Sequence, residues 1–306
     1  MDGRACTTQD PTQNTGQITP DPRNHHTPAP LMPVVAVINR KGGSGKSTLA
    51  THLASHCANK GMRVMLGDVD RQQSSLAWLR RRAAQPLARG AAIVGWVVDT
   101  KSVMRPPTGV THVVLDTPGG LRGLDLARVV MNADLILMPV CDSAFDRESA
   151  AECYAELMSM PRVASQRCKL ALVGMRLDAR TKAAERLEVW AAQHKLPYIG
   201  ALRTSQAYVR SIEQGLTLFD LPPAKVDVDL AQWQPIIDWV EASWRAVEGP
   251  DSRTKSTAPV ASTIGLRPTP VRASPQPPVR DPLRASTRPR LAGRLGWLLT
   301  MFRAPQ

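Results

Sequence analysis

The eight residues from Lys41 to Thr48, KGGSGKST, constrain the fold more than any other part of the sequence. They follow an apolar run at 34–38 that predicts a buried parallel strand, and they lead into a segment at 48–54 that predicts the start of a helix. A glycine-rich turn between a strand and a helix is the setting of a phosphate-binding loop, because glycines admit backbone N–H groups close to phosphate oxygens. The N-terminus of the helix adds partial positive charge. The sequence therefore predicts a nucleotide site at this turn.

Two side chains of the loop have specific expected roles. Lys46 is placed to contact the β- and γ-phosphates of a nucleotide, and the hydroxyl of Ser47 is placed to bind Mg²⁺. The general motif GxxxxGK[ST] needs glycine where this chain has Arg40, so the match is instead to the variant KGGxGK[ST] with an additional lysine, Lys41. The loop residues expected to bind nucleotide are Gly42, Gly43, Ser44, Gly45, Lys46, Ser47 and Thr48.

Three further segments carry a resemblance to the ParA/MinD family of partitioning and positioning ATPases, which extends over about residues 33–248. Residues 64–75 look like the family's second strand and first switch, usually written D-x-D-P-Q. Residues 112–120 look like its Walker B strand and second switch, and residues 133–140 look like the strand that leads to the nucleotide-base loop. Together with the phosphate loop, these segments stand in the family's order and at its spacing.

The alternation of apolar and helical segments from residue 33 to residue 200 predicts an α/β fold with a doubly wound, mostly parallel sheet and Rossmann-like layers. Changes in composition set the expected domain boundaries. We expect a disordered N-terminal extension at 1–33, a P-loop NTPase domain at 34–248, a disordered basic linker at 249–289 and a basic amphipathic helix at 290–303. The N-terminal extension has no apolar core of a secretory signal, and the five scattered cysteines form no CxxC pair, so we expect a cytoplasmic chain without zinc or disulfides.

Positive charge is concentrated in the C-terminal tail. Residues 250–306 contain ten lysines and arginines against two acids, more than half of the chain's excess of +13. This charge favours a polyanionic partner, either DNA or an acidic membrane. Wound as a helix, the end of the tail places its apolar side chains on one face, and it is too short and too charged to span a bilayer. An anionic membrane contact, a protein partner and an incidental helix are the three interpretations of this segment.

The resemblance implies specific roles for residues beyond the loop. It implies that two chains sandwich two nucleotides and that Lys41 of each reaches the nucleotide of the other. It implies that Asp70 orients the attacking water, so that the expected catalytic residues are Lys41, Lys46 and Asp70. Metal binding is expected from Ser47, Asp68 and Asp116, with a helix cap or a surface acid as the alternative role of Asp68. Nucleotide contacts are also expected from Asp116, from the N–H groups of the second-switch glycines Gly119 and Gly120 to the γ-phosphate, and from the base loop at Pro139.

The sequence departs from the family at two positions. Arg71 stands where the first switch usually has proline, which frees the switch backbone and adds a charge. Met175 stands where many relatives have an asparagine that contacts adenine, so the selectivity for the base is open.

Two arginines mark an expected DNA surface. Arg203 and Arg210 flank a helical stretch that resembles the region with which the plasmid and chromosome branch of the family binds DNA. Such contacts would be with phosphates and would carry no sequence information. The alternative is a solvated charged face.

These observations predict an ATPase that hydrolyses ATP with Mg²⁺ as an ATP-dependent dimerisation switch. The switch would position a cargo (a plasmid, a chromosome or a large protein complex) on the nucleoid, and a cargo adaptor would stimulate hydrolysis. The alternative is a positioning or assembly regulator of the MinD or cellulose-synthesis accessory type at the inner membrane. A third interpretation, a metabolic enzyme related to P-loop amidoligases, is weakened because those enzymes generally lack the signature lysine.

Overall fold

A computed structural model of the chain describes residues 32–86, 92–100 and 106–248, and all three ranges fall in one compact unit. The predicted N-terminal extension up to residue 31, the linker at 249–289 and the tail helix at 290–303 lie outside the described residues. The expectations for these segments therefore stay predictions.

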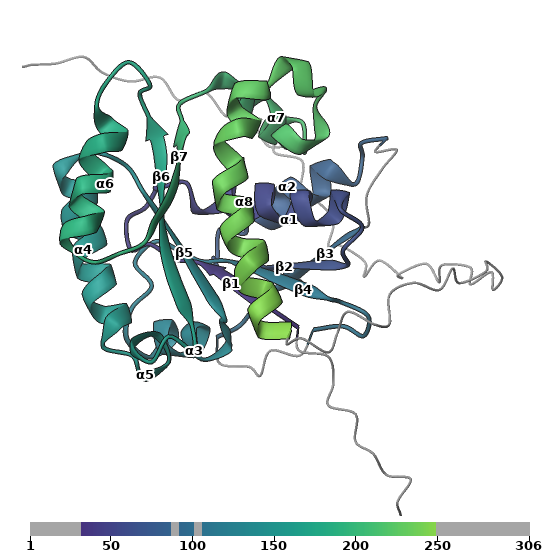
Figure 1. The fold of residues 1–306 in the computed structure, drawn as a ribbon. Coiled ribbons are helices and arrows are strands. Elements are labelled where there is room, and N and C mark those ends of the chain that lie inside the picture. Colours follow the sequence, from purple (N-terminus) through teal and green to yellow (C-terminus); the bar gives the residue numbers. More distant parts are fainter. Residues whose placement is uncertain (1–31, 87–91, 101–105, 249–306) are drawn as a thin grey trace, which may run out of the picture. The chain divides into compact units, whose positions relative to one another are not determined.

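The described part of the chain contains one sheet of seven strands in the order β3-β2-β4-β1-β5-β6-β7, and every neighbouring pair is parallel (Figure 1). The strands β1, β2, β4 and β5 are buried along their whole length, which explains their continuous apolar sequences. The prediction of a doubly wound parallel sheet is confirmed. The strands are β1 Val34–Val37, β2 Val64–Asp68, β3 Ile93–Val97, β4 His112–Asp116, β5 Leu135–Val140, β6 Lys169–Leu177 and β7 Tyr198–Arg203.

Helices cover both faces of the sheet, as a parallel sheet requires (Figure 1). One core lies between the sheet and helices α3, α4, α5 and α6, and the other lies between the sheet and helices α1, α2, α7 and α8. The helices are α1 Lys46–Asn59, α2 Ser74–Arg82, α3 Gly123–Asn132, α4 Ala144–Met158, α5 Pro161–Ala164, α6 Ala183–Gln193, α7 Gln206–Glu213 and α8 Asp227–Glu248, with 3-10 turns η1 Leu218–Asp220 and η2 Pro223–Lys225. Among the described residues, no helix has both the length and the apolar character needed to cross a bilayer.

The strand order brings the predicted motifs together at one edge of the sheet. Strand β1 lies between β4 and β5, and Asp116 at the end of β4 is in register with Val37 on one side and with Asp68 at the end of β2 on the other. The carboxyl ends of these strands therefore meet where the phosphate loop leaves β1. In open α/β sheets ligands bind at this edge, at the point where the strand order changes direction.

Candidate nucleotide-binding site

The phosphate loop connects β1 to α1 and borders a cavity of about 1030 Å³. Gly43 and Gly45 have φ angles of +74° and +94°, a conformation that favours glycine. A Cβ atom added to Gly45 would lie 2.6 Å from Cε of Met175, so the loop also needs glycine there for space. The cavity is large enough for a nucleotide. The residues of the loop that line it are Gly42, Gly43, Gly45, Lys46, Ser47 and Thr48, whereas the side chain of Ser44 is buried.

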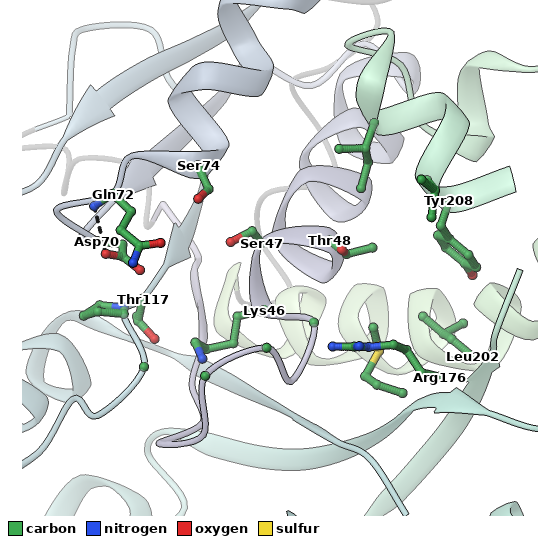
Figure 2. A pocket seen from close by; sticks show the side chains of 18 of the residues that line it. Lys46, Ser47, Thr48, Asp70, Gln72, Ser74, Thr117, Arg176, Leu202 and Tyr208 are labelled. Atoms are coloured by element: carbon green, nitrogen blue, oxygen red, sulfur yellow. Dashed lines mark hydrogen bonds between the residues drawn. The ribbon is translucent and has the colours of Figure 1, made fainter. Parts of the chain in front are cut away.

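The ammonium group of Lys46 faces the cavity and has few contacts that would balance its charge. It donates a hydrogen bond to the backbone carbonyl of Lys41 at 3.0 Å and forms no ion pair with any described residue. Burial lowers the pKa of Lys46, and the nearby carboxylates of Asp116 and Asp70 oppose that shift. Figure 2 shows Lys46, Ser47, Asp70 and Thr117 around the same hollow. A buried cation on the rim of a cavity suits an anionic ligand.

Asp116 carries the clearest sign of a missing partner. Its side chain is fully buried, and neither carboxylate oxygen has a hydrogen-bond partner among the described residues. Burial raises the pKa of Asp116 to about 7. A buried carboxylate is normally paired, hydrogen-bonded or bound to a metal ion. The hydroxyl group of Ser44 is a second buried polar group without a partner in the described part of the chain.

The residues at this edge fit Mg²⁺. This ion usually takes one or two protein oxygens and completes its shell with water and phosphate oxygens. Ser47 and Asp116 supply two such oxygens beside the phosphate loop, and the hydroxyl of Ser47 lowers the pKa of Asp116 against the larger effect of burial. Over residues 32–86, 92–100 and 106–248 there is no group of three or more His, Cys, Asp or Glu side chains that could hold a metal ion by itself.

The contacts of Asp68 are those of a helix cap, the role expected from the sequence as an alternative to metal binding. One carboxylate oxygen accepts hydrogen bonds from the N–H and hydroxyl groups of Ser75, at 3.1 and 2.6 Å, and from the N–H group of Leu76 at 3.2 Å. The other oxygen accepts from the N–H group of Asp70 at 3.0 Å. Asp68 therefore pins the first switch to the start of α2. Metal binding by Asp68 stays a prediction, and it would have to compete with these hydrogen bonds.

Asp70 lies on the wall of the cavity, and its expected role of orienting water stays a prediction. Its side chain is half-buried on the wall of the cavity, and one oxygen accepts a hydrogen bond from the N–H group of Gln72 at 3.0 Å (Figure 2). Arg71, which replaces the family's proline, points away from the core and is exposed. The altered switch sequence therefore leaves the carboxylate of Asp70 at the cavity.

The signature lysine is held within its own chain. The ammonium group of Lys41 lies 2.6 Å from a carboxylate oxygen of Asp146, in the first turn of α4. The hydroxyl of Ser143 accepts a hydrogen bond from the N–H group of Asp146 and so caps this helix. For Lys41 to reach a second chain, the Lys41–Asp146 ion pair would first have to break.

The second switch lies directly on the phosphate loop. A Cβ atom added to Gly119 would lie 3.2 Å from the backbone of Gly42, and the N–H group of Gly120 donates to the carbonyl of Arg40 at 2.6 Å. Pro139 lies apart from the cavity wall, and its carbonyl accepts a hydrogen bond from the side chain of Asn39 at 2.6 Å. A contact of Pro139 with the nucleotide base stays a prediction.

The sequence did not predict most of the cavity wall that is formed by the ends of β6 and β7. Met175 lines it as expected, but so do Arg176 and residues of and after β7, including Leu202 and Tyr208 (Figure 2). Arg176 has a left-handed backbone, with φ of +53°, and its guanidinium lies 3.6 Å from the Cβ position of Gly43. The available signal was position, because β6 and β7 end at the same edge of the sheet as the phosphate loop.

The two arginines of the expected DNA surface differ in their environment. The guanidinium of Arg203 donates to both carboxylate oxygens of Asp229, at 2.7 and 3.2 Å. Arg210 is exposed on α7 and forms no ion pair with any described residue. Only Arg210 is therefore free for a phosphate group, and DNA binding by either residue stays a prediction.

Comparisons with known proteins give the family to which this domain belongs. Residues 35–219 match the family described as the CobQ/CobB/MinD/ParA nucleotide binding domain. The chain is 29% identical to the maintenance of carboxysome distribution protein A of Gloeobacter kilaueensis over 219 residues, which cover 69% of this chain and 95% of that protein. It is 30% identical to the chromosome-partitioning ATPase Soj of Thermus thermophilus over 190 residues, or 52% of this chain and 76% of Soj.

Solved structures share the fold. Apo McdA of Cyanothece superposes with a TM-score of 0.53 at 14% identity, over 70% of this chain and all of that chain. A putative plasmid partition protein of Borrelia burgdorferi, bound to AMPPNP, superposes with a TM-score of 0.54 at 14% identity, over 68% of this chain and all of that chain. From the family match over residues 35–219, the chain belongs to the CobQ/CobB/MinD/ParA family of nucleotide-binding domains.

Proposed function

We propose that this protein is a Mg²⁺-dependent ATPase whose ATP-bound form dimerises and positions a cargo. The observation that carries the proposal is the presence at one cavity of two buried groups that make no ion pair in the described part of the chain: the ammonium of Lys46 and the carboxyl group of Asp116. A Mg²⁺–nucleotide complex supplies the opposite charge to each of them. The names of the relatives, carboxysome distribution and chromosome partition, support cargo positioning as the use of this chemistry.

The residues of the chain divide the work of hydrolysis. Lys46 and the glycine N–H groups of the loop bind the phosphates, and Ser47 and Asp116 would hold the metal. When bound, Mg²⁺ neutralises charge that develops on the phosphoryl oxygens. Asp70, which also lines the cavity, accepts a hydrogen bond from a water and orients it for attack. Little covalent chemistry is needed from the protein, because phosphoryl transfer depends on position and charge.

Lys41 supplies the dimer dependence. It follows Arg40 at the exposed edge of the loop, next to Gly42, whose Cβ position meets no atom within 4 Å. Open space beside Gly42 leaves room for a second chain. When two chains meet there, each Lys41 exchanges its ion pair with Asp146 for the phosphates of the opposite nucleotide.

ATP turnover, dimer formation and nucleotide binding test this mechanism together. Lys46→Ala should abolish nucleotide binding, Lys41→Ala should bind ATP without dimer-dependent turnover, and Asp70→Ala should form an ATP-bound dimer that does not hydrolyse. Lys182→Ala, at an exposed lysine of the same chain, is the matched control and should behave like the parent. A Lys41→Ala variant that hydrolyses ATP like the parent protein would show that no lysine acts between chains.

We propose non-specific DNA as the surface on which the dimer acts. Arg210 is the exposed, unpaired candidate contact, whereas Arg203 is committed to Asp229. Arg210→Glu should therefore weaken duplex binding by the ATP-loaded protein more than Arg203→Gln, and parent affinity should fall steeply with salt. Binding to anionic vesicles that is lost when residues 290–303 are deleted would favour the membrane-surface alternative instead.

A further inference from the structure

Arg40 joins the phosphate loop to helix α4. One terminal guanidinium nitrogen of Arg40 donates to a carboxylate oxygen of Glu152 at 3.2 Å, and the second terminal nitrogen donates to a carboxylate oxygen of Glu156. The side chains of Arg40 and Glu156 are 19% and 21% exposed, so most of this contact is shielded from water. The hydrogen bond with Glu156 raises the pKa of Arg40. Burial opposes ionisation of Glu156, but the hydrogen bonds from Arg40 and Gly123 and the charges of Arg40 and Arg122 together outweigh burial and lower the pKa of Glu156.

The same two residues fasten the second switch at two points. The free carboxylate oxygen of Glu156 accepts a hydrogen bond from the N–H group of Gly123 at 2.7 Å, at the start of α3. The backbone carbonyl of Arg40 accepts from the N–H group of Gly120 at 2.6 Å. Immediately before Gly120, Gly119 packs closely on the loop, because an added Cβ atom would lie 3.2 Å from the backbone of Gly42. The second switch is thus held to the phosphate loop at Gly119 and Gly120, and the start of α3 that follows it is held to α4 at Gly123.

This arrangement uses an N–H group that the family resemblance assigns to the γ-phosphate of a bound nucleoside triphosphate. The second-switch glycines are the groups expected to donate to the γ-phosphate, but the N–H of Gly120 is already donated to Arg40. The switch must move away from Arg40 before this N–H can turn toward a γ-phosphate. A diphosphate has no γ-phosphate and makes no such demand.

We propose that Arg40, Glu156 and the N–H group of Gly123 form a latch that holds the second switch closed and lowers the affinity for ATP relative to ADP. The proposal rests on the proposed function, because it concerns regulation of the same nucleotide site. Arg40 and Glu156 act as positioning residues through the switch. The apparent affinity for ATP is reduced by the fraction of molecules in which the latch is open, so weakening the latch raises it.

Paired titrations with ADP and with AMPPNP, both with Mg²⁺, test the latch in the full-length chain. Glu156→Gln keeps an oxygen for Gly123 but removes the charge that holds Arg40, and Arg40→Gln removes the same ion pair from the other side. Each variant should bind AMPPNP roughly three- to tenfold more tightly and ADP within about twofold of the parent. Glu185→Gln, at an exposed glutamate of α6, is the matched control and should change neither affinity.

Other results overturn the latch. Equal loss of affinity for both nucleotides would indicate a purely structural contact, and an unchanged ratio of the two affinities would rule out the ion pair as a cause of nucleotide preference. Amide hydrogen exchange over residues 118–124 gives a measurement on the parent that needs no nucleotide. The latch predicts slow exchange in the free protein and faster exchange in Glu156→Gln, and fast exchange in the parent would contradict it. A parent that binds neither nucleotide would instead contradict the proposed function, and the exchange measurement would still decide on the latch.

Discussion

Two buried aspartates in this protein have opposite environments. Asp116 stands at the end of β4 with neither oxygen hydrogen-bonded within the described residues, and burial raises its pKa to about 7. Asp220, in the turn η1, receives two hydrogen bonds from Arg82 at 2.7 and 2.9 Å and further ones from Ser55, Asn59 and Thr217. Burial opposes ionisation of Asp220, but these contacts outweigh it and lower its pKa to about 2. A satisfied buried charge holds elements together, whereas an unsatisfied one marks where a ligand belongs.

The Asp220 junction (Arg82, Asp220, Ser55, Asn59 and Thr217) also supports the site from a distance. Arg82 is the last residue of α2, the helix that follows the first switch, while Ser55 and Asn59 lie on α1, the helix that follows the phosphate loop. The junction therefore anchors the far ends of both helices. The first residues of these helices, Lys46 and Ser74, line the cavity where the ligand would bind.

The largest expected effect on stability comes from removing one half of the junction. Arg82→Leu should lower the free energy of unfolding by about 3–5 kcal/mol, because it leaves the buried charge of Asp220 without its partner. Urea unfolding checks this value, and Arg81→Leu, at an exposed neighbour in the same helix, is the control that should cost less than about 0.5 kcal/mol. If both variants lowered the free energy of unfolding equally, Arg82 would not be a specific partner of Asp220, and the contrast between Asp220 and Asp116 would be lost.

Asp116→Asn should raise the free energy of unfolding, whereas Arg82→Leu should lower it. Since the pKa of Asp116 is about 7 in the folded chain and lower in the unfolded chain, the folded state binds more protons between pH 4 and 7, and stability falls as pH rises through this window. Without nucleotide, the variant should be more stable than the parent by about 2–4 kcal/mol at pH 8, and the gain should vanish near pH 4. Thermal unfolding across this range measures it. A loss of stability at pH 8 would mean that Asp116 has a partner in the free protein.

Asp220→Asn should show the reverse dependence on pH. The folded pKa of about 2 lies below the unfolded value, so the stabilisation is present above pH 4 and is lost as pH falls toward 2. The variant should be less stable by about 2 kcal/mol at pH 7 and equal to the parent near pH 2. Chemical unfolding at several pH values gives the comparison, and a difference that does not depend on pH would assign the loss to packing.

The smallest expected effect concerns the glycines of the two regions. In Gly45→Ala the new Cβ meets the flexible end of Met175, whereas in Gly215→Ala it lies 2.4 Å from the backbone nitrogen of Arg82. Both positions have positive φ, so each substitution costs about 1–2 kcal/mol for the backbone conformation. Gly45→Ala should cost little more than that, and in a Met175→Ala background the same substitution should cost only the amount due to the backbone conformation. A higher cost for Gly45→Ala than for Gly215→Ala in urea unfolding would contradict this reading of the loop.

The sequence was most informative where one local pattern determines structure. The apolar runs at 34–38 and 112–115 predicted central strands, and the KGGSGKST loop predicted the turn and the start of α1. Asp116 was expected at the site from the resemblance of residues 112–120 to a Walker B strand, and its place at the end of a parallel strand puts it at the ligand edge of the sheet.

The remaining features depend on pairs of residues far apart in the chain. Lys41 and Asp146 are separated by more than 100 positions, and nothing local to either residue marks the ion pair. Asp229 likewise pairs with Arg203, which changes the interpretation of an arginine chosen for its charge. The hydrogen bonds of Asp68 to Ser75 and Leu76 depend on a left-handed turn at Gln73, which the glutamine itself does not predict.

Calorimetric titration of AMPPNP with and without Mg²⁺ tests the central claim most directly, because it asks whether Lys46 and Asp116 serve one ligand. Mg²⁺ should strengthen binding to the parent at least about tenfold, Asp116→Asn should lose that gain and Lys46→Ala should not bind. Asp134→Asn, at a half-buried aspartate that precedes β5 and lies off the cavity wall, should keep it. A parent whose affinity does not depend on Mg²⁺, or a Lys46→Ala variant that binds like the parent, would contradict the assignment of this edge of the sheet as a Mg²⁺–nucleotide site.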